Sequence, residues 1–175
     1  MVALENFSKA KLIEIIRMYA KNWLAHDGCW FLAIEEAYGI ETAIKFDAKA
    51  WERFTIIEAQ RIMETFSLPQ NGGLHALAQA LQYRLYAQVN TQEIISVNEK
   101  KLLFKMNDCR VQSARKRKGL DDFPCKPVGI VEYSGFARTV DSRIKTSCIA
   151  CPPDNHPAEF WCAWEFTMAS FSTND

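Results

Sequence analysis

The amino-acid sequence has no excess of charge of either sign, because its 21 lysines and arginines balance its 21 aspartates and glutamates. A chain without net charge lacks the long-range field that concentrates nucleic acid or anionic lipid around a protein. The one dense basic run, "RKRK" at residues 115–118, would spread around all sides of a helix and form no stripe. We therefore expect neither nucleic acid nor a membrane among the partners.

Long apolar runs are also missing: none approaches the roughly 20 residues that a membrane-spanning helix needs. The opening stretch "MVALENFSKAKLIEIIRMYAKNW" interleaves charged with apolar residues, unlike a secretory signal. These features favour the cytoplasm, where thiols stay reduced. The six cysteines are accordingly expected to be free thiols or metal ligands, not disulfides.

Glycine and proline are few, at seven and six residues, and residues 40–66 contain neither. Leu12, Ile15, Ile16 and Tyr19 follow the spacing of one helix face, which predicts an opening helix. A short helix is predicted over "DGCWFLAIEEAYG", with Asp27 as its N-cap and a stop at residue 39. Further helices are predicted over 40–66 and, after a break at residues 69–73, from residue 74. Three tryptophans of this half are interpreted as core residues: Trp23, Trp30 and Trp51.

From residue 90 the apolar period changes to that of strands. Strands are predicted at 93–97, 101–106, 143–150 and 159–168, and helices at 109–119 and 126–140. The fold class is therefore α+β: an N-terminal helical bundle packed on a four-stranded antiparallel sheet, with two helices inserted between the strand pairs. We expect a single domain over 1–175, made of a helical part at 1–72 and a sheet part at 74–168.

Four cysteines in the C-terminal part have a spacing suited to one metal: Cys125, Cys148, Cys151 and Cys162. Four thiolates make a tetrahedral zinc site, and a C-x2-C pair beside a turn can aim two sulfurs at one point. On the last strand, Cys162 shares a face with Trp164 and Phe166, which is expected to point inward. Ordinary buried thiols, a redox pair, and iron or an iron–sulfur cluster remain as alternatives.

Three segments carry these cysteines: "FPCKPVGIVEYSGF", "SCIAC" and "WCAWEF". Together they resemble the vinyl-4-reductase domain, over residues 74–168. The resemblance implies a structural zinc held by the four cysteines, with Cys148 standing where related aromatic-sensing regulators carry a carboxylate. Those regulators hold a phenol with a histidine and a tryptophan. The corresponding positions here are His75 and Phe104.

The same resemblance implies a homodimer and a small apolar or aromatic ligand. Two-fold association is also the commonest oligomeric arrangement of soluble proteins. The ligand cavity is expected between the "LHALAQALQYRLY" helix, the strand of Phe104 and the two helices after Cys109, away from the metal. His75 would then be its polar anchor and Phe104 its stacking wall.

An enzymatic alternative comes from the N-terminal segments "HDGCWFLAIEEAYG" and "FDAKAWERF". They resemble uncharacterised prokaryotic cytosolic proteins grouped with the aminothiazoline-carboxylate hydrolase family. Cys109, at a predicted strand-to-helix junction, could be a nucleophile activated by the helix dipole. A carboxylate pair for acid–base work could come from four acidic residues: Asp27, Glu35, Glu36 and Asp47. The sequence has no G-x-S-x-G elbow. We favour the binding or regulatory module over the hydrolase.

Overall fold

The computed structural model of the chain describes residues 3–168, with the side chains of residues 96 and 97 left aside. The helical half consists of η1 (Leu4–Asn6), α1 (Lys9–Tyr38), α2 (Ile40–Thr65), α3 (Gly73–Tyr83) and η2 (Leu85–Gln88). The rest consists of β1 (Thr91–Val97), β2 (Lys101–Asp108), α4 (Arg110–Arg117), α5 (Lys126–Val140), β3 (Ile144–Ala150) and β4 (Cys162–Met168). This order confirms the predicted α+β class.

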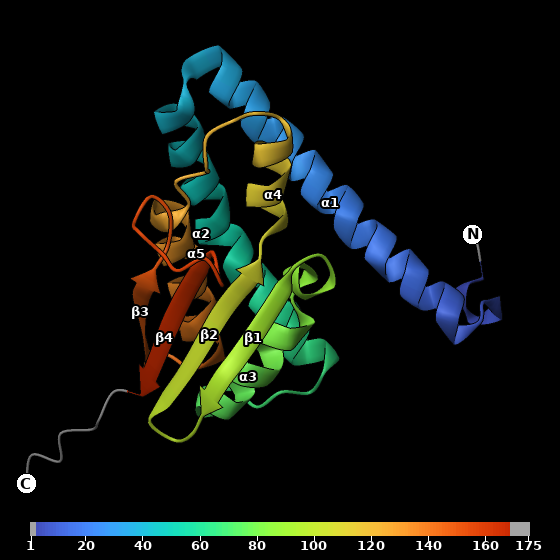
Figure 1. The fold of residues 1–175 in the computed structure, drawn as a ribbon. Coiled ribbons are helices and arrows are strands. Elements are labelled where there is room, and N and C mark those ends of the chain that lie inside the picture. Colours follow the sequence, from blue (N-terminus) through green and yellow to red (C-terminus); the bar gives the residue numbers. More distant parts are fainter. Residues whose placement is uncertain (1–2, 169–175) are drawn as a thin grey trace, which may run out of the picture.

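The opening of the chain differs from the prediction, because α1 is one uninterrupted helix. Ser8 is its N-cap, and the Ser8 hydroxyl accepts a hydrogen bond of 3.2 Å from the backbone N–H of Lys11. Asp27 is therefore not a cap but lies inside the helix, where its carboxylate is free to point at another element. Gly39 ends α1 with a φ of 83°, a conformation that glycine adopts without strain. The N-terminal half of α1 extends away from the rest of the molecule (Figure 1).

The sheet has the strand order β1-β2-β4-β3, and its neighbouring strands are antiparallel. Helices α2, α3 and α5 lie behind one face of it (Figure 1). On β2, Leu102, Phe104 and Met106 alternate with less buried residues, as predicted from the period of two. Phe104 is paired with Trp164 and Met106 with Cys162, so the inward faces of β2 and β4 coincide.

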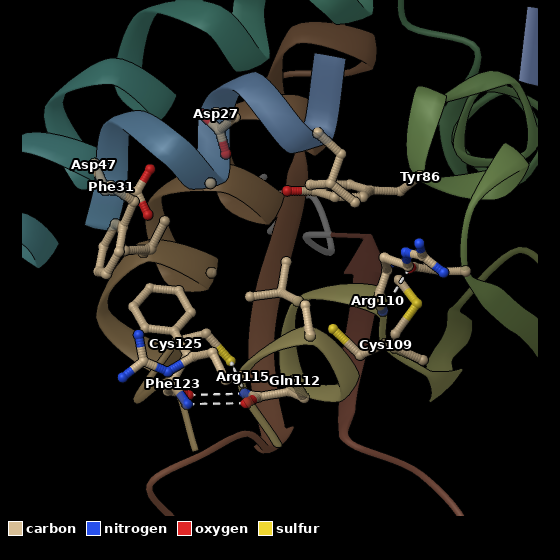
Figure 2. Close-up of a pocket in the computed structure, with 18 of the residues that line it drawn as sticks. Asp27, Phe31, Asp47, Tyr86, Cys109, Arg110, Gln112, Arg115, Phe123 and Cys125 are labelled. Atoms are coloured by element: carbon tan, nitrogen blue, oxygen red, sulfur yellow. Dashed lines mark hydrogen bonds between the residues drawn. The ribbon is translucent and has the colours of Figure 1, made fainter. Parts of the chain in front are cut away.

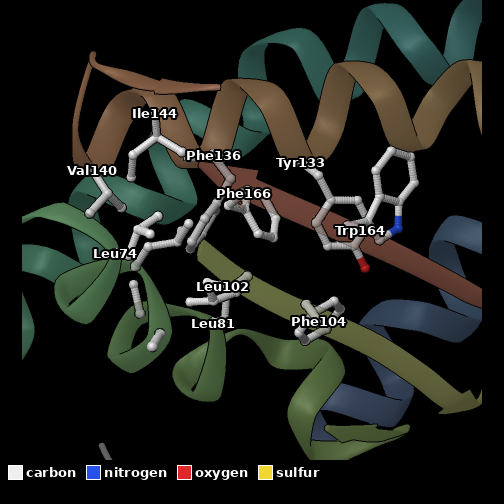
Figure 3. Close-up of a cluster of buried hydrophobic side chains, with 14 of the residues drawn as sticks. Leu74, Leu81, Leu102, Phe104, Tyr133, Phe136, Val140, Ile144, Trp164 and Phe166 are labelled. Atoms are coloured by element: carbon white, nitrogen blue, oxygen red, sulfur yellow. The ribbon is translucent and has the colours of Figure 1, made fainter. Parts of the chain in front are cut away.

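The main core fills the space between this face and the helices (Figure 3). Tyr133 of α5 stacks on Trp164 of β4 with ring centroids 4.7 Å apart, and Phe136 is fully buried beside them. A Cβ on Gly129 would lie 2.7 Å from the Trp164 ring, so glycine is what lets α5 approach β4 this closely. The α3 side of the predicted ligand cavity, around Phe104, is therefore filled by packed side chains.

A buried ion-pair cluster ties the helices together. Arg84 leads into η2, and its Nε lies 2.8 Å from Glu58 Oε2 of α2. Its Nη1 lies 2.7 Å from Glu132 Oε1 of α5. All three side chains are less than a tenth exposed. Within residues 3–168, no helix is both long enough and apolar enough to cross a bilayer.

Candidate functional site

A cavity of about 350 Å³ lies among α1, α2, η2, α4 and α5 (Figure 2). As predicted, both helices after Cys109 and the strand β2 border it, but α3 and Phe104 do not. It is also not away from the predicted metal ligands, because Cys125, Cys151 and Cys162 line it. Helix spacing explains which side chains line it. Asp27 and Phe31 of α1 are four residues apart, as are Asp47 and Trp51 of α2, so each pair shares one helix face.

Aromatic rings form much of the wall. Phe31 and Phe123 meet edge to face with ring centroids 4.9 Å apart, and Trp51 stacks on Tyr86 at 5.7 Å. Trp23 packs behind them, while Trp30 is 63% exposed and is not the core residue that the sequence predicted. Rings that pack on one another have little freedom to collapse into the space. The packing of these rings therefore keeps the cavity open.

Three carboxyl groups come together at one end of the cavity: Asp27 of α1, Asp47 of α2 and Glu132 of α5. Burial raises the pKa of Asp47 to about 7, and the negative charges of Asp27 and Glu132 add to this rise. Burial also raises the pKa of Asp27 and that of Glu132, although Arg84 acts in the opposite direction on Glu132. Figure 2 shows the Asp27 carboxylate and the Tyr86 hydroxyl on the same side of the cavity. This end of the cavity is acidic and poorly solvated.

Two buried polar atoms on the cavity wall have no well-directed hydrogen bond within residues 3–168: Nε1 of Trp164 and Oε1 of Glu132. Within residues 3–168, nothing accepts a hydrogen bond from Nε1 of Trp164, which is 1% exposed. Glu132 Oε1 is close to Arg84, but no well-directed hydrogen bond reaches it in the described part of the chain. Buried polar atoms are rarely left unsatisfied in folded proteins. Trp164 Nε1 is free to donate to a molecule in the cavity, whereas Glu132 Oε1 is already in an ion pair with Arg84 and has a lone pair left for a further donor.

Thiols form another part of the wall: Cys109, Cys125, Cys151 and Cys162 all line the cavity. Cys125 Sγ and Cys151 Sγ are 3.5 Å apart. Gln112 holds Phe123 and Cys125 in place, because its Nε2 donates to the Phe123 carbonyl at 2.8 Å and to Cys125 Sγ at 3.6 Å. The hydrogen bond with Cys151 holds the pKa of Cys125 below its ordinary value, and the pKa of Cys151 is raised by its bonds with Cys125 and Cys162.

The predicted metal ligands are thus partly assembled. In a tetrahedral zinc site with bonds of about 2.3 Å, neighbouring sulfurs are about 3.8 Å apart, so the Cys125–Cys151 separation is close to one edge of such a site. Cys148 is half-buried on β3, paired with Trp164 and not on the cavity wall. Across residues 3–168, no group of three or more cysteine, histidine or acidic side chains is arranged to hold a metal ion.

The predicted ligand-binding residues are scattered. His75 is exposed on α3, and Phe104 is buried in the main core, so neither of them reaches the cavity. Cys109 does line it, as the N-cap of α4. Burial raises the pKa of Cys109 to about 12, the opposite of the activation by the helix dipole that the sequence suggested. At neutral pH Cys109 is a thiol and not a nucleophilic thiolate.

The mouth of the cavity carries basic side chains from α4. Arg115, the first residue of the basic run 115–118, is only 8% exposed. Its Nη1 and Nη2 lie 2.7 and 3.0 Å from the two carboxylate oxygens of Glu35, a bidentate pair that joins α4 to α1. Glu35, predicted as a possible acid–base residue, is therefore held in an ion pair that joins two helices, and it does not line the cavity.

Sequence reasoning named Asp27 and Asp47 but missed Tyr86 and Glu132. The sequence did indicate Glu132, because this residue lies on the apolar face of α5 between Val128 and Phe136. A charged side chain on a buried helix face usually has a partner or a function. For Tyr86 we find no such signal. These residues are far apart in the sequence, so local patterns cannot predict that they line one cavity.

Comparison with known proteins gives one match. The model of a family of unknown function (DUF6125) matches residues 5–168. No curated protein and no solved structure matches the chain.

Proposed function

Because the chain belongs to DUF6125, a family of unknown function, its function must be argued from the cavity, and we propose that it is a small-molecule-binding or regulatory domain. The observation that carries this proposal is the cavity of about 350 Å³ with aromatic walls and a few convergent polar groups. That size and this composition are typical of small-molecule sites. An apolar or aromatic body would fill the space between Phe31, Trp51 and Tyr86.

Native mass spectrometry of freshly purified protein tests this proposal. We expect a small molecule to remain with the wild-type chain and to be missing from Ala114→Trp, whose indole would occupy the cavity from α4. Ala10→Trp, at an exposed position of α1 outside the cavity, is the matched control. Identical spectra for all three proteins would count against a binding function.

We also propose a structural zinc ion held by Cys125, Cys148, Cys151 and Cys162. The Cys125–Cys151 edge and the chemistry of four thiolates support this set. Cys148 would need to turn toward the other three. None of the six cysteines forms a disulfide, which supports the cytoplasmic location that we propose.

Cys151→Ser is expected to lose the zinc and to unfold more readily, because metal binding is coupled to folding. Elemental analysis and thermal melting of purified protein measure both effects. Cys29→Ser, at an exposed cysteine of α1, should keep the wild-type values. Equal zinc content and equal melting temperature in the two variants would contradict the metal proposal.

A homodimer is the third part of the proposal. Ile16, Tyr19 and Trp30 of α1 are each more than half exposed, so the helix presents large apolar side chains to solvent. A second copy of the chain would cover them. Light scattering at micromolar concentration should give twice the 20.1 kDa of the chain, and Ile16→Glu should reduce this mass to that of a monomer. A wild-type mass of 20.1 kDa would refute the dimer.

The second candidate function is a hydrolase related to the aminothiazoline-carboxylate hydrolases. It is favoured by Asp47, whose raised pKa of about 7 suits a general acid or base at neutral pH. Consumption of 2-aminothiazoline-4-carboxylate by the wild type, and its loss in Asp47→Asn, would support this candidate. No turnover by the wild type would leave the binding module as the better proposal.

A further inference from the structure

We propose that the cavity takes a small organic amine, whose protonated nitrogen lies among the carboxylates of Asp27, Asp47 and Glu132. This inference rests on the proposed binding function and names the chemical class of its ligand. The chemistry is that of a primary ammonium group on an apolar or aromatic body.

The charge balance of the interior is the first argument. Arg84 is the buried cation next to this end of the cavity, and it is already shared between Glu58 and Glu132. Asp27 and Asp47 are half-buried and have no ion-pair partner among the described residues, so this end of the cavity holds more carboxyl groups than cations. Burying an ionised carboxylate without a partner is costly, and a bound cation removes that cost.

The cations that line the cavity elsewhere do not cancel this excess. Lys21, Arg110, Arg117 and Lys118 are exposed to solvent. Arg115 is held in its bidentate pair with Glu35. Charges at an exposed mouth are screened by water, whereas those in the interior are screened far less. The acidic end therefore attracts a positive group that enters past the mouth.

The aromatic walls are the second argument. The guanidinium of Arg84 already lies over the rings of Trp51, Tyr86 and Tyr133, with its carbon 5.4 to 5.6 Å from their centroids. These rings also line the cavity. An aromatic box with acidic residues is the arrangement that proteins use to bind organic cations. The same rings pack against the apolar body of the ligand.

Polar atoms on the cavity wall that are not fully satisfied are the third argument. Glu132 Oε1 pairs with Arg84 at 2.7 Å but has no well-directed hydrogen bond in the described chain, so it has a lone pair left for an ammonium N–H. Trp164 Nε1, likewise without an acceptor within residues 3–168, is a donor available to an oxygen on the ligand. Both are buried on the cavity wall. A ligand carrying an ammonium group and one acceptor atom satisfies both.

Three probes of similar size test the inference by isothermal titration calorimetry: 2-phenylethylamine, 2-phenylethanol and 3-phenylpropanoate. The amine is expected to bind at least about tenfold more tightly than the alcohol, because a hydrogen-bonded charge pair contributes more than 1.4 kcal/mol. The carboxylate is expected to bind weakest. Asp47 ionises when the cation binds, so at pH 7 about half a proton should be released per amine, measured in buffers of different ionisation enthalpy.

Asp47→Asn separates the charge effect from the shape of the cavity. We expect it to bring the amine to within about threefold of the alcohol and to abolish the proton release. Glu52→Gln, an exposed site on the same helix, should behave as the wild type. Alcohol binding as tight as amine binding, or an unchanged preference in Asp47→Asn, would overturn the inference and leave the binding function standing. Failure of all three probes, with no co-purified molecule, would overturn both.

Discussion

Arg84→Met is expected to lower the free energy of unfolding by about 3–5 kcal/mol, the cost of leaving a buried ion pair with one partner removed. Arg84 is 2% exposed and holds Glu58 and Glu132, which come from two different helices. Glu58 Oε1 also accepts a hydrogen bond of 3.4 Å from the backbone N–H of Leu85. Without the guanidinium, two carboxylates would remain in an apolar interior. Urea denaturation at pH 7 measures the loss.

The triple variant Arg84→Met, Glu58→Gln, Glu132→Gln carries no charge at this position and should recover much of that stability. Lys11→Met is the exposed control, because it breaks the solvent-facing pair with Glu14 and should leave the free energy of unfolding almost unchanged. If the single and the triple variant lost the same free energy, the buried charges would not be the cause.

Asp47→Asn is expected to make the protein more stable above neutral pH, by up to about 4 kcal/mol. Burial raises the pKa of Asp47 from its ordinary 3.8 to about 7, so the folded protein binds this proton more tightly than the unfolded chain does. The stability that the group contributes is complete below about pH 4 and is lost as the pH rises to about 7. Asparagine has nearly the same shape as aspartate but does not ionise, so the variant avoids this loss of stability at high pH.

Denaturation between pH 4 and pH 8 checks this sign. The wild type should lose stability across that window, and Asp47→Asn should lose less. Glu52→Gln on the same helix is exposed and should follow the wild type. Parallel curves for the wild type and Asp47→Asn would show that the Asp47 carboxyl is not held protonated. Together with the amine titration, a stabilised variant that no longer prefers the amine would identify Asp47 as a residue kept for binding at the expense of stability.

The order of helices and strands was predictable because each element carries its own period. The alternation of Leu102, Phe104 and Met106 indicated both the strand β2 and its buried face, and the helical period of α5 overcame its two glycines. The inward face of Cys162 followed from the same rule. The buried face of a helix or strand depends on the spacing of apolar residues within that element, so it can be predicted from the sequence.

The sequence could not show which residues meet. Asp27 and Asp47 lie on two helices, and Glu132 follows 85 positions after Asp47 in the chain. Asp27 was interpreted as a cap because an aspartate side chain readily accepts a hydrogen bond from the first backbone N–H groups of a helix. Only the packing of α1, α2 and α5 places the three carboxyl groups in one cavity. The length of α1, the side on which the cavity opens and the pKa of Cys109 were likewise decided by burial, which depends on every element around a residue and not on its neighbours in sequence.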